Sequence, residues 1–95
     1  MAYKLSGLAA QDFADIYEYS LLNFGVKQAD FYTDELKQLL NKLDETPLIG
    51  KSCSDLAPEL LKFPFQHHII FYRKRSQDIF VVRFLHEKMQ PKLHL

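Results

Sequence analysis

The chain has 95 residues, of which 47% are hydrophobic and 25% charged, with a formal net charge of zero, a balance typical of a soluble globular protein. We expect residues 1–95 to form a single domain. No apolar run is long enough to span a membrane, and the single cysteine, Cys53, excludes a framework of internal disulfides, so we expect a cytoplasmic protein with no membrane partner.

A short strand and a helix are predicted at the N-terminus. Ala2–Ser6 is typical of a strand, and the hydroxyl of Ser6 is placed to cap a following helix. Gly25 predicts the end of this helix, because glycine readily adopts the left-handed conformation found after helix C-termini. The residues expected on its buried face recur at helical spacing and are Phe13, Ile16, Tyr17, Ser20 and Phe24.

The second helix, which begins near Val26, has the clearest pattern in the chain. Pro47 cannot continue it, and the short connection at Gly25 predicts that the two helices form an antiparallel hairpin. The expected buried face of the second helix consists of Ala29, Tyr32, Leu36, Leu39, Leu40 and Leu43.

Three strands are predicted after a loop that spans residues 49–58. They cover Leu60–Phe65, His67–Lys74 and Ile79–His86, and the polar connection at residues 75–78 makes the last two antiparallel neighbours. Both are apolar at consecutive positions, which indicates that both faces of the sheet are covered, one by the helices and the other by something outside a lone domain. The predicted fold class is α+β, in the order β-α-α-β-β-β, with a helical hairpin packed on a small, largely antiparallel sheet.

Charge is distributed unevenly along the chain. Residues 1–61 carry five lysines and ten acidic side chains, a net charge of −5, whereas residues 62–95 carry seven lysines or arginines and two acids, a net charge of +5. The C-terminal third therefore favours an acidic partner. Its candidate target-binding residues, on or just beyond the last two strands, are Arg73, Arg83, His86 and Lys88.

These four side chains also allow a catalytic interpretation. Cations there would hold an RNA phosphate while His86 moves a proton, which is the chemistry of RNA cleavage. Basic strand ends are more often solvated or paired with acids, here the acids of the helices. We therefore favour pairing or binding over catalysis, and we expect no catalytic residue.

The histidines and the cysteine do not indicate a metal or cofactor site. His67 and His68 are adjacent in a predicted strand, so their side chains are expected on opposite faces. Cys53, His86 and His94 have no ligand spacing, and no glycine-rich phosphate loop is present. We expect no metal and no cofactor, and we expect Cys53 to be a core or loop residue.

Leu22 and Phe31 lie off the apolar stripes of their helices. A single exposed apolar side chain is normal, so neither residue is informative alone. Together with the strands that are apolar on both faces, Phe71 among them, they predict a surface covered by an amphipathic segment of a partner.

The sequence resembles the ParE toxins of the RelE/ParE superfamily over essentially its whole length. The resemblance rests on the order and spacing of LSGLAAQDFADIYEYSLLNFG, QADFYTDELKQLLNKLDETPLIGK, FPFQHHIIFYR and VVRFLHEKM. It implies a helical hairpin on an antiparallel sheet and the toxin half of a type II toxin-antitoxin pair. It also implies a cognate antitoxin that wraps the apolar surface in a hetero-oligomeric complex, and through which alone the toxin reaches operator DNA.

The resemblance implies a target as well. ParE toxins usually block DNA gyrase so that replication stalls, whereas the RelE branch cleaves mRNA in the ribosome and commonly uses a C-terminal tyrosine. No tyrosine follows Tyr72 here, although Arg83, His86 and Lys88 remain as substitutes. The net charge of zero disfavours ribosome binding. We expect a gyrase inhibitor that acts by binding, with ribosome-dependent mRNA cleavage as the alternative.

Overall fold

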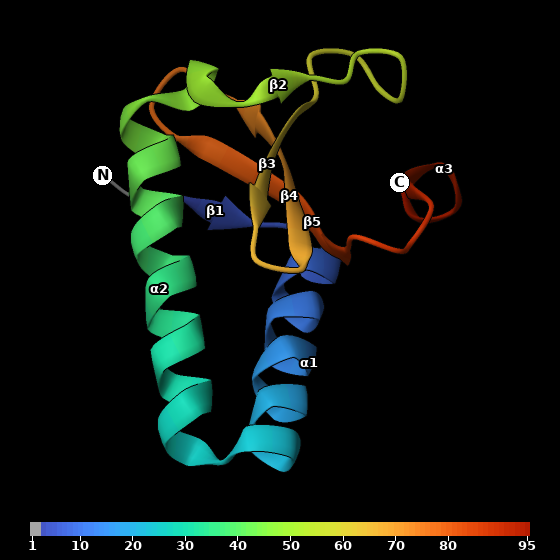
Figure 1. Cartoon of the computed structure of the whole chain (residues 1–95). Coiled ribbons are helices and arrows are strands. Elements are labelled where there is room, and N and C mark those ends of the chain that lie inside the picture. The colour runs from blue at the N-terminus through green and yellow to red at the C-terminus, as the bar shows by residue number, and fades with distance from the viewer. Residues whose placement is uncertain (1–2) are drawn as a thin grey trace.

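A helical hairpin packed on one face of a five-stranded sheet makes up the body of the computed structural model, which describes residues 3–95 (Figure 1). This arrangement confirms the predicted α+β fold class and the helical hairpin. In chain order the elements are β1 Lys4–Leu5, α1 Gly7–Phe24, α2 Val26–Glu45, the 3-10 helix η1 Pro47–Ile49, β2 Lys51–Ser52, β3 Leu61–Phe65, β4 His68–Lys74, β5 Ile79–His86 and α3 Pro91–His94.

The strands are ordered β1-β5-β4-β3-β2 across the sheet. β1 runs parallel to β5, and the remaining neighbours are antiparallel, so the sheet is largely antiparallel as predicted. Ala2, where the first strand was expected to begin, lies outside the described residues. The two-residue β2 and the short α3 were not predicted, because elements of this length carry no periodic pattern.

Both ends of α1 have the predicted chemistry. The Ser6 hydroxyl accepts a hydrogen bond from the Ala9 amide at 2.9 Å and donates one to the Val82 carbonyl at 2.7 Å, so the cap of α1 also ties it to β5. Gly25 joins the helices with a φ of 92°, which favours glycine.

Among residues 3–95 no helix has the length and apolar composition needed to cross a membrane.

The main core lies between the helices and the sheet. The predicted stripe of α2 is confirmed, since Ala29, Leu36, Leu40 and Leu43 are buried and the other two members are packed against the core. In α1 the prediction is wrong for Phe24, which is exposed. The reason is visible in Figure 1, where the tip of the hairpin extends past the end of the sheet.

The second face of the sheet is covered by the chain itself. The segment Cys53–Leu60 lies over it, and Cys53 and Leu60 form a buried cluster there with Phe71 and Leu85. The expectation that a lone domain leaves this face of the sheet open was therefore wrong. The cover is the Cys53–Leu60 loop, which has no periodic apolar pattern that would predict its position from the sequence. Cys53 is a core residue, as expected, and burial raises the pKa of its thiol.

A close approach between β4 and the η1 turn fixes the end of the core beneath β2. The fully buried Tyr72 donates a hydrogen bond to the Pro47 carbonyl at 2.6 Å. A Cβ atom on Gly50 would collide with the hydroxyl and ring of Tyr72. Gly50 has an ordinary φ of −71°. Glycine is therefore needed here because it has no side chain to collide with Tyr72, and not because of its backbone freedom.

We expect Gly50→Ala to lower the free energy of unfolding by about 1–3 kcal/mol, because Tyr72 must shift and weaken its hydrogen bond. Gly7→Ala is the matched control, since a Cβ there meets nothing within 4 Å, and it should change stability by less than about 1 kcal/mol. Urea unfolding measures both values. Equal losses in the two variants would contradict the packing explanation.

Candidate functional site

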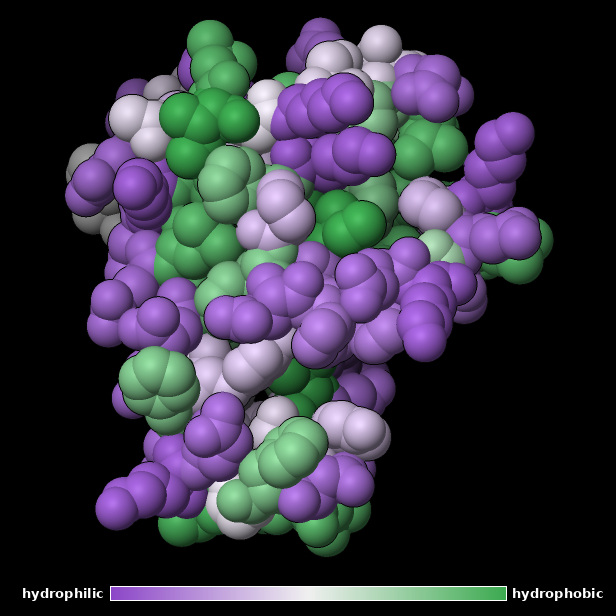
Figure 2. All heavy atoms as spheres, viewed as in Figure 1, coloured by the Kyte–Doolittle hydropathy of each residue, from purple (hydrophilic) through white to green (hydrophobic). Residues whose placement is uncertain are grey.

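A groove of about 850 Å³ lies between the outer half of the helical hairpin and the end of the sheet where β4 begins and β5 ends. Figure 2 shows this recess as a hollow with apolar side chains inside it, between the hairpin tip and a band of hydrophilic side chains. The groove exists because the hairpin extends past the sheet, so the inner faces of both helices have no strand beneath them there (Figure 1).

The helical wall of the groove is aromatic with an acidic rim. α1 contributes Tyr19 and Phe24, and α2 contributes Phe31, of which all three are exposed. Asp12 and Asp15 of α1 lie nearer the sheet. Aromatic side chains left in contact with water at a concave surface are typical of a protein-binding site.

Three histidines form the sheet end of the groove. The His86 ring lies 5.5 Å from that of His68 and 6.4 Å from that of His67. The prediction that His67 and His68 leave opposite faces of a strand was wrong, because β4 begins at His68 and His67 belongs to the preceding turn. Within residues 3–95 no group of three or more His, Cys, Asp or Glu side chains is arranged to hold a metal ion.

The histidines are held by hydrogen bonds from the surrounding elements. Nδ1 of His68 lies 3.0 Å from the hydroxyl of Tyr32 on α2, and Nδ1 of His67 lies 3.0 Å from the carboxylate of Glu87. Burial lowers the pKa of His68, and the neighbouring His86 and His67 lower it further. The lowered pKa favours the neutral form of His68, and its Nδ1 shares a hydrogen bond with the Tyr32 hydroxyl.

Arg83, a predicted target-binding residue, is used inside the fold. Its guanidinium forms two hydrogen bonds with the carboxylate of Asp12, at 2.7 and 2.9 Å, and a third with the His94 carbonyl at 2.9 Å. Both charged side chains are largely buried, with 14% and 13% exposed, and the bonds to Asp12 raise the pKa of the guanidinium. The pairing with an acid of the helices is therefore confirmed for Arg83, which leaves its side chain little exposed surface, and its contact with a target stays a prediction.

The other three basic candidates do not converge. Lys88 lies in the turn after β5 and its amide donates to Nδ1 of His86 at 3.2 Å. Arg73 lies five residues along β4 from His68, which pairs with His86, so roughly 16 Å of strand separates Arg73 from them. Arg73 instead donates to the Pro58 carbonyl at 3.2 Å. The set predicted for RNA cleavage is thus spread over the sheet.

The predicted partner-binding residues have three different environments. Phe31 is 61% exposed and lines the groove. Leu22 is 78% exposed near the hairpin tip and does not line it. Phe71 is fully buried under the Cys53–Leu60 segment, so its selection as a contact residue was wrong. The groove residues missed from the sequence include Asp12, Asp15, Tyr19, Phe24, Tyr32, His67 and His68.

Comparisons with known proteins place the chain in a family. A sequence model of the “ParE toxin of type II toxin-antitoxin system, parDE” matches residues 3–91. The chain belongs to the ParE toxin family. It is 33% identical over 94 residues to Toxin ParE1 of Mycobacterium tuberculosis and 32% identical over 93 residues to Toxin ParE1 of Caulobacter vibrioides, with 98% of this chain and 96% of each relative covered.

Two further comparisons agree with the family. Toxin ParE of Escherichia coli is 32% identical over 89 residues, covering 93% of this chain and 86% of that relative. A solved structure described as “Chromosomal ParDE TA system from P. aeruginosa” superposes with a TM-score of 0.75 at 17% identity, over 90% of this chain and 95% of that one, and so shares the fold. The predicted resemblance is confirmed, and this ParE-family chain is the toxin component of a type II toxin-antitoxin system.

We expect Arg83→Ala to lower the free energy of unfolding by about 2–4 kcal/mol, because it leaves the largely buried Asp12 carboxylate without its partner and frees the tail at His94. Arg75→Ala removes an exposed arginine paired with Asp78 and should cost less than about 1 kcal/mol. Urea unfolding of both variants at neutral pH tests the difference. A loss at Arg83 no larger than that at Arg75 would show that the pair is not structural.

Proposed function

We propose that this ParE-family toxin inhibits DNA gyrase by binding, with no catalytic residue of its own, and that a cognate antitoxin neutralises it by filling the groove. The observation that supports this best is the groove itself, an open recess walled by aromatic side chains of two helices. The toxin acts in the cytoplasm and reaches operator DNA only through the antitoxin.

The shape and chemistry of the groove fit an amphipathic helix. Two helices and a sheet end enclose it, and its exposed aromatic side chains are Tyr19 and Phe24 of α1 and Phe31 of α2. A helix laid into such a groove buries its apolar side chains against these aromatics and leaves its polar face in water. Large aromatic anchors of this kind carry most of the binding energy in protein interfaces. Leu22, near the tip, would extend the same contact.

Binding is favoured over RNA cleavage by the position of the charges. Asp15 lines the groove and opposes an RNA phosphate there, and the guanidinium of Arg83 is already neutralised by Asp12. Stabilising a phosphoryl transition state requires cations that converge on one point. Arg73 and His86 lie at opposite ends of β4 and β5.

The same positions separate two kinds of contact. His86 lines the groove, so an antitoxin in the groove covers it. Arg73 and Lys88 lie outside the groove and are the basic side chains proposed to contact gyrase. The antitoxin would then neutralise the toxin by covering the part of the target surface that includes His86.

Purified toxin is expected to abolish supercoiling by gyrase and to cause cleaved DNA to accumulate, while leaving cell-free translation unaffected. The physical reason is that a binding inhibitor needs only surface complementarity, whereas the charges here do not assemble a nuclease site. A supercoiling assay and a translation assay run side by side provide the measurement. Cuts in mRNA with unimpaired gyrase would contradict the proposal.

Phe31→Glu is expected to weaken antitoxin binding about thirtyfold, since loss of an aromatic anchor costs about 2 kcal/mol. Leu8→Glu is the matched control, because Leu8 is also 61% exposed but lies outside the groove. Calorimetry with the small protein encoded beside the toxin gene measures both affinities, and urea unfolding confirms that both variants are folded. Equal weakening by the two substitutions would place the antitoxin elsewhere.

A further inference from the structure

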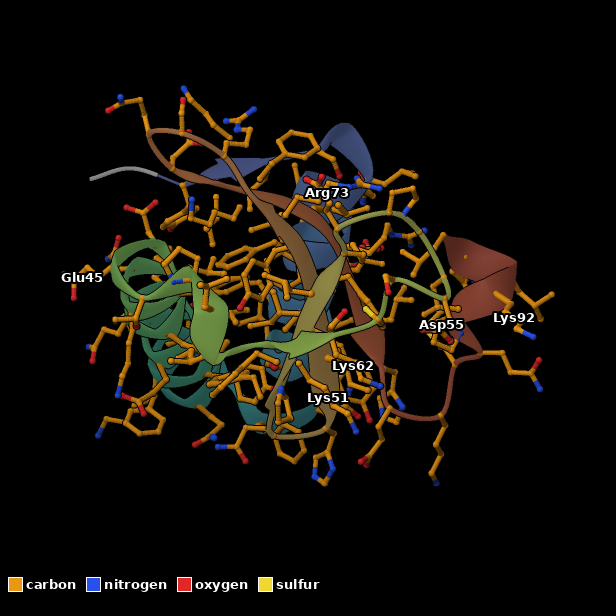
Figure 3. All side chains as sticks on the ribbon, turned by 90° about the horizontal axis from the view of Figure 1, so that it is seen from above. Glu45, Lys51, Asp55, Lys62, Arg73 and Lys92 are labelled. Carbon is orange, nitrogen blue, oxygen red and sulfur yellow. The ribbon has the colours of Figure 1, made fainter. Side chains whose placement is uncertain are left out.

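β2 carries an unfavourable arrangement of charge that the toxin fold does not explain. Lys51 of β2 lies directly opposite Lys62 of β3 in the register, and Figure 3 shows the two side by side. Neither forms an ion pair within residues 3–95. Like charges directly opposite one another destabilise a strand pair. An anion seated between these ammonium groups would remove that cost.

The opposite face of the same two strands carries an apolar pocket. Ser52 and Leu61 are the next register pair, so their side chains point away from those of the lysine pair. Both line a pocket of about 240 Å³ beside the 74% exposed Leu48 of η1. The remaining lining residues are Glu59, Leu60 and Lys74.

β2 is also the terminal strand of the sheet, so the backbone of its outer edge has no strand beside it in the described part of the chain. An unpaired edge can hydrogen-bond an extended segment of another chain, and because β2 has only two residues, most of the contact must come from side chains on both faces. Side chains of an added strand alternate between its two faces. One set would lie next to Lys51 and Lys62, and the other would lie over the apolar pocket.

We propose that the β2 edge binds an extended segment of a partner protein in which carboxylate and apolar side chains alternate. The carboxylates sit against the Lys51–Lys62 pair, and the apolar side chains enter the pocket formed by Leu48, Leu60 and Leu61. This site is separate from the groove, because the two share no lining residue and β2 pairs with the start of β3, at the other end of that strand from Phe65 and the neighbouring His68 of the groove. It therefore stays open when the groove is filled.

A protein segment explains this surface better than a nucleic acid does. Two lysines neutralise few phosphates, and the chain as a whole has no net positive charge. The pocket is mainly apolar, and the carboxylate of Glu59 there offsets the charge of Lys74, so it offers a phosphate backbone no net positive charge. An alternating acidic and apolar strand uses both faces at once.

The test is an NMR titration of the full, isotope-labelled chain with a short blocked peptide in which aspartate and valine alternate. We expect amide shifts to concentrate at residues 48–52 and 60–62. The double variant Lys51→Glu/Lys62→Glu should weaken binding by about tenfold or more. The control Lys27→Glu/Lys42→Glu, which changes two exposed lysines of α2, should leave the affinity unchanged. Amide spectra establish that each variant is folded.

Two further probes separate the charge from the apolar contribution. Replacing valine by serine in the peptide, or Leu48 by serine in the protein, should each weaken binding, because the pocket then loses its occupant or its wall. Shifts confined to the groove residues, equal binding by the charge-reversed variant, or tighter binding of a short duplex DNA through the same residues would each overturn the proposal.

Discussion

The carboxylate of Asp12 holds three parts of the molecule together. It receives two hydrogen bonds from Arg83 and a third from the Phe84 amide at 3.1 Å, on the stretch of β5 that the short β1 leaves unpaired. Through Arg83 it also fixes the C-terminal tail at His94. The first turns of α1 are thereby pinned to the edge of the sheet, and the rest of the hairpin is aimed past the sheet end. The groove depends on that direction.

The groove follows from a mismatch in length. α1 and α2 contain 18 and 20 residues, or about 27 and 30 Å, and they meet the sheet only along their sheet-proximal halves. Beyond that point the inner faces still carry large side chains, among them Tyr19, Phe24 and Phe31, which remain in water. Isolated folding would favour polar side chains there, so their presence is best explained by a partner that covers them.

The two proposed surfaces thus differ in chemistry. The groove has aromatic side chains toward the hairpin tip and carboxylates and a histidine cluster toward the sheet, whereas the β2 edge has an unpaired lysine pair beside an apolar pocket. The net charge of zero conceals this separation, since the acids lie mainly on the helices and the bases on the sheet. The proposed function, in which the toxin is held by one protein and acts on another, needs two surfaces that do not overlap fully.

The sequence by itself determined the local structure. The Ser6 cap, the break at Gly25, the buried stripe of α2 and the strand pair around residues 75–78 were predicted correctly, because each depends on residues within a few positions of one another. The order and spacing of the quoted sequence segments also indicated the family. For the candidate site the sequence supplied Phe31 and His86, and it missed the rest of the groove, whose residues come from both helices, the start of β4 and the end of β5.

Only the tertiary structure decided which side chains meet. Arg83 and Asp12 are 71 positions apart, and no local pattern reveals that they form a pair rather than an exposed cation and an exposed acid. Phe71 is buried because the irregular Cys53–Leu60 loop packs over it. Lys51 lies opposite Lys62 because the two-residue strand β2 pairs with β3. Periodicity reports which face of an element is apolar, whereas the partner of that face is set by packing over the whole chain.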